Sequence, residues 1–227
     1  MAGAAAWWGP GAAAHCPPLA RALDLRCRLT RPTSAVALTF DDGPHPEGTP
    51  AILDALDEAG ATGVFFLVGE QVVRYPELVR AIVAAGHEPA VHGFRHRNQM
   101  RLTPGAITRD LREAVAVIRE ISGRAPTLYR PPYGAFTAGG LAAIRRSRLQ
   151  PLLWSRWGRD WHSDVSVERI AALAASGVRA GDVVLLHDAD WYSAPGAHTR
   201  TARALPAILE QIKSRGLQPV VRTADLT

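Results

Sequence analysis

Five short groups of residues in this chain carry side chains that can bind a metal ion or move a proton. They contain carboxylates, imidazoles and guanidinium groups, which serve in general acid–base catalysis and in metal-assisted hydrolysis. Each group follows an apolar run of the kind that forms a buried strand. The groups lie at residues 41–44, 92–96, 130–134, 160–161 and 187–188.

The first two groups together have the composition of a metal site. Asp41 and Asp42 are adjacent after an apolar run, where two carboxylates repel each other unless a cation or an arginine offsets their charge. His92 and His96 are four residues apart, so both imidazoles can face one point. Two histidines and one carboxylate leave positions open for water and substrate. Taken separately, the aspartates also fit a turn that caps the next helix, and the histidines also fit exposed positions.

The other three groups supply candidates for proton transfer. Arg130 precedes two prolines that stiffen the backbone, and it either keeps a carboxylate ionised or lies on the surface of a rigid loop. His187 ends an apolar run and is either a core histidine or a proton donor, with Asp160 as its partner. Trp161 is either a wall of the pocket or a core residue. We expect the remaining histidines to be exposed, namely His15, His45, His87, His162 and His198.

The elements that must position these groups alternate along the chain. Short β-rich runs predict strands, and amphipathic patterns with Pro, Thr and Gly at their ends predict helices. The expected strands are residues 36–40, 64–68, 90–91, 127–129, 152–154, 183–186 and 219–221. The expected helices are residues 49–60, with Thr49 as the cap, 76–86, 103–123, 138–146, 167–176 and 201–215.

This alternation predicts the fold class. A strand–helix unit repeated about seven times indicates a mostly parallel sheet covered by helices, either an open doubly wound sheet or a (β/α) barrel. No GxGxxG turn follows the first strand, so dinucleotide binding loses its main support. Because the polar groups follow strands, and barrel enzymes hold their sites at the carboxyl ends of strands, we predict an α/β fold of the (β/α) barrel kind with about seven parallel strands and an active site at that face.

Composition excludes several classes of protein. The 227 residues are 47% hydrophobic and 21% charged, which excludes a disordered or fibrous chain. No apolar run reaches the ~20 residues of a membrane-spanning helix, so we expect no integral membrane segment. The net charge is +5, but the arginines are scattered, so we expect no nucleic-acid partner. Cys16 and Cys27 are too few for a disulfide framework or a four-cysteine zinc site, and one bridge or two free thiols remain open.

The first 34 residues differ from the rest. They are rich in Ala, Gly and Pro, carry no charge near the start, and are interrupted by Gly9-Pro10-Gly11, which does not match a secretory signal. We expect an N-terminal arm over residues 1–34, with the remnant of a targeting segment as the alternative. Residues 35–227 are expected to form one catalytic domain.

Five motifs occur in an order that resembles a known family. They are TFDDGP at 39–44, the two histidines at 92 and 96, RPPYG at 130–134, the Asp-Trp pair at 160–161 and LLHD at 185–188. Together they resemble the polysaccharide deacetylases of carbohydrate esterase family four, from about residue 35 to the C-terminus. The resemblance implies a distorted (β/α) barrel and a divalent metal that assists removal of acetyl groups from N-acetylated sugars. The implied partner is an acetylated glycan such as peptidoglycan or a chitin-like oligomer.

The resemblance also implies a ligand set. By position, Asp42, His92 and His96 are similar to the ligands of one divalent metal ion, with zinc preferred and cobalt or nickel as alternatives. Gly93 departs from the family, which usually has serine or threonine after the first histidine. The change removes a hydroxyl that could brace the loop, but it removes no ligand.

The resemblance implies catalytic roles for four further residues. Asp41 is similar to the catalytic base, and Arg130 to the residue that holds this base. His187 is similar to the catalytic acid, and Asp160 to the carboxylate that orients it.

Substrate contacts are implied for a third set of residues. The backbone N–H of Tyr133 would stabilise the oxyanion, and Leu185 and Trp161 would enclose the acetyl methyl group. Pro131 is expected beside them among the substrate-binding residues.

Two other functions fit the same residues. An O-acetyl esterase acting on a polysaccharide such as acetylated xylan would use the same centre on an easier leaving group. A catalytically silent glycan-binding domain is disfavoured, because the base, the ligands and the acid are all present. A cell-envelope or extracellular location is suggested by the resemblance alone, and a monomer is plausible.

Overall fold

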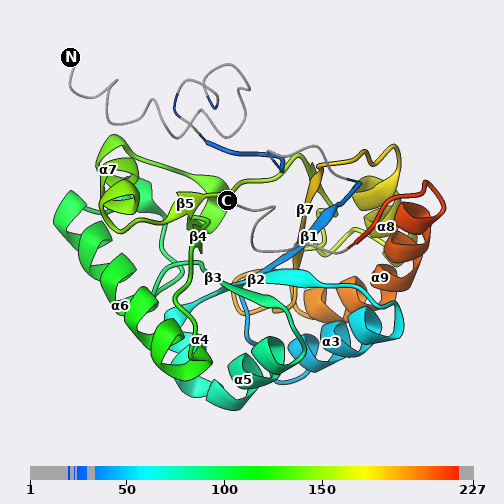
Figure 1. Ribbon diagram of the computed structural model, residues 1–227, viewed down its shortest axis with the longest axis horizontal. Coiled ribbons are helices and arrows are strands. Elements are labelled where there is room, and N and C mark those ends of the chain that lie inside the picture. Colours follow the sequence, from blue (N-terminus) through cyan, green and yellow to red (C-terminus); the bar gives the residue numbers. More distant parts are fainter. Residues whose placement is uncertain (1–19, 21–22, 24, 30–33, 220–227) are drawn as a thin grey trace.

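The computed structural model describes residues 20, 23, 25–29 and 34–219. Seven strands form one sheet in the order β5-β4-β3-β2-β1-β7-β6, and all neighbouring strands are parallel. The sheet curls, with the helices around its outer side (Figure 1). The strands are β1 (Ala37–Asp41), β2 (Gly63–Leu67), β3 (Glu88–Val91), β4 (Leu128–Tyr129), β5 (Gln150–Pro151), β6 (Arg156–Trp157) and β7 (Val183–His187). The predicted distorted barrel is therefore confirmed.

The central strands are apolar on both faces because both faces are covered. Strands β1 and β2 are buried along their whole length. One face packs against the helices in the main core, which includes Phe40, Phe65 and Leu186. The other face forms a smaller cluster inside the curl, which consists of Ala37, Val64, Phe66, Ala90, Leu128, Leu152 and Val183. The curl is thus filled by side chains.

The helices largely follow the expected pattern. Helix α6 shows why: Thr103 accepts a hydrogen bond from the N–H of Ala106, Pro104 occupies the first position, and Gly123 ends the helix in the left-handed conformation. The helices are α3 (Gly48–Glu58), α4 (Gly69–Arg74), α5 (Pro76–Ala84), α6 (Pro104–Ser122), α7 (Ala138–Arg146), α8 (Val167–Ala175) and α9 (Ala197–Lys213), with 3-10 turns η1 (Gln99–Arg101) and η2 (Pro132–Gly134). Helix α4 was not predicted, and α9 begins four residues before its expected start.

The strand expected at residues 152–154 is wrong. The chain pairs with β4 through β5 and with β7 through β6, on either side of this segment. The carbonyls of Leu152 and Leu153 accept hydrogen bonds from the Arg130 side chain instead of from a neighbouring strand. The segment therefore connects the two ends of the open sheet.

Part of the expected N-terminal arm packs on the domain. Arg26 bridges to Leu152 next to β5, and Arg28 bridges to Asp182 ahead of β7, with which it also forms an ion pair. Residues 25–29 therefore link the region of β5, at one end of the sheet, to the start of β7. Most of the other residues of the expected arm or targeting segment at 1–34, including residues 1–19 with Cys16, lie outside the described residues, as do residues 220–221 of the last expected strand. Cys27 is half-buried with a free thiol, and none of the described helices is long and apolar enough to span a membrane.

Candidate active site

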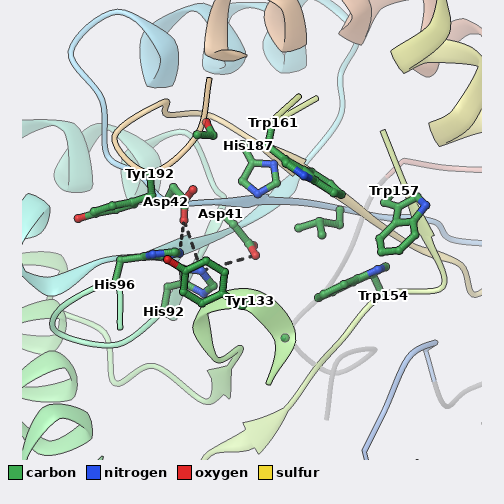
Figure 2. A pocket seen from close by; sticks show the side chains of 13 residues that line it. Asp41, Asp42, His92, His96, Tyr133, Trp154, Trp157, Trp161, His187 and Tyr192 are labelled. Carbon is green, nitrogen blue, oxygen red and sulfur yellow. Dashed lines mark ion pairs between the residues drawn. The ribbon is translucent and has the colours of Figure 1, made fainter. Parts of the chain in front are cut away.

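The five polar groups meet in one pocket at the carboxyl ends of the strands. Asp41 at the end of β1 stands in register with His187 at the end of the neighbouring strand β7. The pocket has a volume of about 240 Å³, and Figure 2 shows the aspartates and histidines on one side of it and three tryptophans on the other. Its lining residues are Asp41, Asp42, His92, His96, Tyr133, Gly134, Trp154, Trp157, Trp161, Leu185, His187, Tyr192 and Ser193.

Asp42, His92 and His96 come together as a potential ligand set. Asp42 Oδ1 lies 3.4 Å from His92 Nε2 and 3.2 Å from His96 Nε2 (Figure 2), and all three side chains are buried. Asp42 has a φ of 79°, in a region that few residues other than glycine occupy. Burial favours the neutral acid, but the neighbouring imidazoles of His92 and His96 outweigh it and lower the pKa of Asp42. The carboxylate is therefore ionised at neutral pH.

The donors of this set fit a divalent cation. His92 Nδ1 lies 2.8 Å from the carbonyl oxygen of Arg130, which can only accept, so Nδ1 carries the hydrogen. The lone pair of His92 Nε2 then faces the Asp42 carboxylate, and two acceptors at this distance repel each other unless a proton or a metal ion lies between them. A backbone carbonyl that accepts from the other ring nitrogen of a histidine ligand, and the His-His-carboxylate composition, are both typical of metal sites.

Asp110 braces the loop that carries both histidines. Its carboxylate accepts hydrogen bonds from the N–H groups of Phe94 and Arg95, at 2.8 and 3.3 Å, and from the Arg97 guanidinium at 2.8 Å. Gly93 has a φ of 91°, and a Cβ there would lie 3.0 Å from Asp110 Oδ2. Glycine therefore suits this backbone, and Asp110 on α6 braces the loop from outside.

A second carboxylate, Asp41, is held by a buried arginine. Asp41 Oδ1 lies 2.6 Å from Arg130 Nη1, and Asp41 Oδ2 lies 3.8 Å from His92 Nε2. Arg130 is fully buried and also donates to the Thr39 hydroxyl and to two carbonyls, while its guanidinium lies 4.0 Å from the centre of the Phe66 ring. Arg130 is therefore no surface residue, and it offsets the charge of one of the two adjacent aspartates.

His187 and Asp160 form a separate pair. His187 Nδ1 lies 3.0 Å from Asp160 Oδ1, and the backbone N–H of His187 donates to Asp160 Oδ2 at 2.7 Å. The Thr201 hydroxyl also donates to Oδ2, which orients the fully buried carboxylate. Burial alone would lower the pKa of His187, but the Asp160 carboxylate outweighs it and raises that pKa to about 10. At neutral pH this histidine carries a proton.

The expected substrate contacts divide into two groups. Tyr133, Leu185 and Trp161 line the pocket, and Tyr133 is 62% exposed at its mouth with a φ of 63°. Pro131 is buried and is not among the lining residues. Its carbonyl accepts a hydrogen bond from the N–H of Gly134, so Pro131 supports the turn that presents Tyr133.

Several pocket residues were not found from the sequence. Tyr192 stacks on His96 with ring centres 4.2 Å apart and donates its hydroxyl hydrogen to Glu70. Trp154 and Trp157 continue the aromatic wall that begins at Trp161. Tyr192 lies five residues after His187, in the loop that follows β7. Because the loops after the strands build the site in such folds, its position in this loop could have predicted it as a pocket residue.

Three of the histidines expected at the surface are buried: His45, His87 and His198 are 6%, 2% and 8% exposed. His45 and His198 lie with their rings 4.2 Å apart, and Asp190 approaches both. His45 Nδ1 accepts from the N–H groups of Glu47 and Gly48, so Nε2 carries the hydrogen and has no free lone pair for a metal. The cluster of His45, Asp190 and His198 therefore lacks one of the three free donors that a metal site built on it would need.

Comparison with known proteins identifies the family. The fold and the site define an α/β-barrel enzyme with a hydrolytic type of centre, and the family model for polysaccharide deacetylases matches residues 28–151. The chain is 36% identical over 193 residues to a chitooligosaccharide deacetylase of Bradyrhizobium sp.. The aligned region covers 82% of this chain and 88% of that protein. This chain belongs to the polysaccharide deacetylase family.

Other relatives agree with this assignment. A peptidoglycan-N-acetylglucosamine deacetylase of Bacillus cereus is 32% identical over 182 residues, with 80% of this chain and 64% of that protein covered. A family 4 carbohydrate esterase from Streptomyces lividans, solved in complex with acetate, superposes with a TM-score of 0.75 at 28% identity, over 85% of this chain and 94% of that one. A crystal structure of a peptidoglycan N-acetylglucosamine deacetylase gives a TM-score of 0.80 at 28% identity, over 87% and 90% of the two chains.

Proposed function

We propose that this protein is a metal-dependent deacetylase that hydrolyses the N-acetyl groups of sugars in peptidoglycan or a chitin-like oligomer. The observation that carries the proposal is a single pocket that combines an arginine-paired carboxylate, an Asp-His-His ligand set and a His–Asp pair. Relatives that are chitooligosaccharide and peptidoglycan deacetylases support the same reaction. The catalytic domain would comprise residues 35–227.

Asp42, His92 and His96 would hold the divalent cation, zinc in the first instance, with cobalt or nickel as alternatives. When bound, such an ion polarises a carbonyl group and lowers the pKa of a water molecule from 15.7 to about 7. The buried carboxylate and the orienting hydrogen bond on His92 support this ligand set.

Asp41 is the proton acceptor of the proposed reaction. Arg130 pairs with one of its oxygens at 2.6 Å, while the other oxygen faces the ligand set. Asp41 can then take a proton from the attacking water as the C–O bond forms.

His187 is the proposed proton donor. An amide is cleaved only if the departing nitrogen is protonated, since an amine anion is a poor leaving group. His187 is protonated to the imidazolium at neutral pH because Asp160 stabilises this charge, and both His187 and Tyr133 line the pocket. Acid and base are therefore different residues.

The remaining contacts serve the acetyl group. The backbone N–H of Tyr133 would stabilise the oxyanion, a contribution of about 3–4 kcal/mol per donor in other hydrolases. Leu185 and Trp161 would enclose the methyl group, and both line the pocket.

Acetate release from a panel of glycans tests the proposal. We expect release from N-acetylglucosamine oligomers or peptidoglycan fragments that stops on chelation and returns when zinc is added. Asp41→Asn is expected to keep bound metal but to lose acetate release, while the exposed Asp54→Asn serves as a control on α3. Substantial turnover by Asp41→Asn would refute the assigned base. Faster release from acetylated xylan than from every N-acetylated substrate would identify an O-acetyl esterase instead.

A further inference from the structure

A second cavity adjoins the active-site pocket. It has a volume of about 500 Å³ and lies beside the loop after β3 and the turn η1. Two of its lining residues, His96 and Tyr133, also line the active-site pocket, so the two hollows share a wall. The other lining residues are Arg97, Asn98, Arg101 and Leu102. A glycan that places one sugar at the metal ligands can therefore extend a neighbouring sugar into this cavity.

The charge of this cavity is positive. Its lining contains two guanidinium groups and no carboxylate. Arg97 pairs with Asp110 through Nη2, but Asp110 is also shared with two backbone N–H groups, and the Arg97 side chain is 43% exposed with further donors available. Arg101 is exposed, and within the described part of the chain it has no acidic partner.

Arginine at this place suits an anionic group on the substrate. The guanidinium presents several N–H donors in a rigid plane that matches a carboxylate, and its charge does not depend on pH. Asn98 uses its side-chain oxygen to accept from the N–H of Met100, which fixes the start of η1 and with it the position of Arg101. The exposed ring of Tyr133 at the shared wall offers an apolar face to a sugar that spans the two cavities.

We infer that this cavity is a subsite for a carboxylate-bearing sugar next to the acetylated sugar at the metal ligands, and that Arg101 is its specificity-determining residue. The inference rests on the proposed function and narrows its substrate class. It favours peptide-free peptidoglycan strands, in which the ether-linked side chain of N-acetylmuramic acid ends in a free carboxylate, over neutral chitin-like oligomers. The ring carboxylate of a uronic acid would satisfy the same chemistry.

A comparison of matched substrates tests this subsite. The kcat/KM for acetate release is measured on peptide-free peptidoglycan oligosaccharides and on N-acetylglucosamine oligomers of equal length, each at low and high salt. For the wild type we expect a preference for the acidic substrate that declines with added salt. Arg101→Gln is expected to lower the acidic-to-neutral ratio of kcat/KM by about 10-fold, mainly through KM, because a hydrogen bond to a charged group contributes about 1.5 kcal/mol or more. Arg101→Glu should lower the ratio further, and Arg101→Lys should restore part of it.

The results that would contradict the subsite can be distinguished from a failure of the proposed function. Arg112→Gln changes an exposed arginine on α6 that lines neither cavity, and it is expected to leave the ratio at the wild-type value. An Arg101→Gln ratio equal to that of the wild type overturns the subsite, even if both proteins release acetate normally. An effect seen only on fragments that carry stem peptides overturns the assignment to a sugar carboxylate. Absence of acetate release by the wild type from every substrate would instead defeat the proposed function.

Discussion

Replacing Arg130 by lysine tests whether a buried arginine organises the site. The Arg130 side chain makes four hydrogen bonds, to Asp41, to Thr39 and to the carbonyls of Leu152 and Leu153. A lysine ammonium can replace the charge beside Asp41 but cannot also reach two carbonyls on the far side of a planar fork. Each buried carbonyl left without a donor costs about 1–3 kcal/mol, so the expected loss is about 2–6 kcal/mol. That is a large part of the ~5–15 kcal/mol by which a domain is usually stable.

Urea unfolding followed by tryptophan fluorescence measures this loss, since the chain has six tryptophans. Arg130→Met goes one step further, because it leaves the buried Asp41 carboxylate without a cation, which costs about 3–5 kcal/mol. Arg112→Lys, on the exposed side of α6, is the matched control.

One result would refute the reasoning. Suppose that the free energy of unfolding of Arg130→Lys lies within about 0.5 kcal/mol of the wild-type value, the range of an ordinary surface substitution. The hydrogen bonds of the guanidinium would then not hold the segment at residues 152–153. Normal acetate release by the same variant would show that a point charge beside Asp41 is sufficient.

Three further perturbations test other parts of the site. A Cβ at Gly43 would lie 2.3 Å from Asp188 Oδ2, so Gly43→Ala should destabilise the protein by about 1–3 kcal/mol, and Asp188→Ala should relieve part of that loss in a double-mutant cycle of urea unfolding. Asp160→Asn should lower the pKa of His187 from about 10, which moves the alkaline limb of kcat to lower pH in a pH–rate profile. The folded state binds the His187 proton more tightly than the unfolded state does. This proton therefore adds to the free energy of unfolding of the wild type below pH 6.5, and the contribution is lost as the pH rises through about 10. Asp160→Asn should abolish this decline in urea unfolding curves measured across that pH range. Asp110→Ala removes the brace of the loop that carries both histidines, so zinc affinity measured by titration against a competing chelator should fall by about 10–100-fold; unchanged affinity would contradict that role.

The strand positions that hold the polar groups could be predicted from the sequence. Strands β2 and β7 are apolar runs, and β1 is interrupted only by Thr39, because both faces of the sheet are covered, and such runs are visible without a partner strand. The polar residue that ends each run then marks the carboxyl edge. Asp41 and His187 are 146 residues apart in the chain, yet this logic brings them to neighbouring strand ends in one pocket.

The region between residues 150 and 157 could not be predicted in the same way. Strands β5 and β6 have two residues each, which is too short for a hydrophobic period to be recognised. Leu152 and Leu153 look like strand residues because they are buried, but their carbonyls bond to a side chain from β4's end and not to a strand. The apolar pattern therefore indicates only that these residues are buried, and it does not show which groups their carbonyls bond to.

Thr49 shows how the site itself overrides a local rule. Thr103, Thr137 and Ser166 each cap a helix by accepting a hydrogen bond from the N–H three residues later. The same signal at Thr49 predicted a cap and is wrong, since the helix begins at Gly48 and the Thr49 hydroxyl donates to Asp188 at 2.5 Å.

The partner of Thr49 explains the exception. Burial raises the pKa of Asp188 to about 7, although the hydrogen bond from Thr49 lowers it. A buried carboxyl group without a hydrogen-bond partner costs more free energy than an uncapped helix start, so the Thr49 hydroxyl bonds to Asp188. Asp188 directly follows His187 and touches the turn at Gly43, which connects both halves of the site. The helix-cap preference of Thr49, worth about 1 kcal/mol, is therefore overridden here, because its hydroxyl is the donor to Asp188, which joins β7 to the turn after β1.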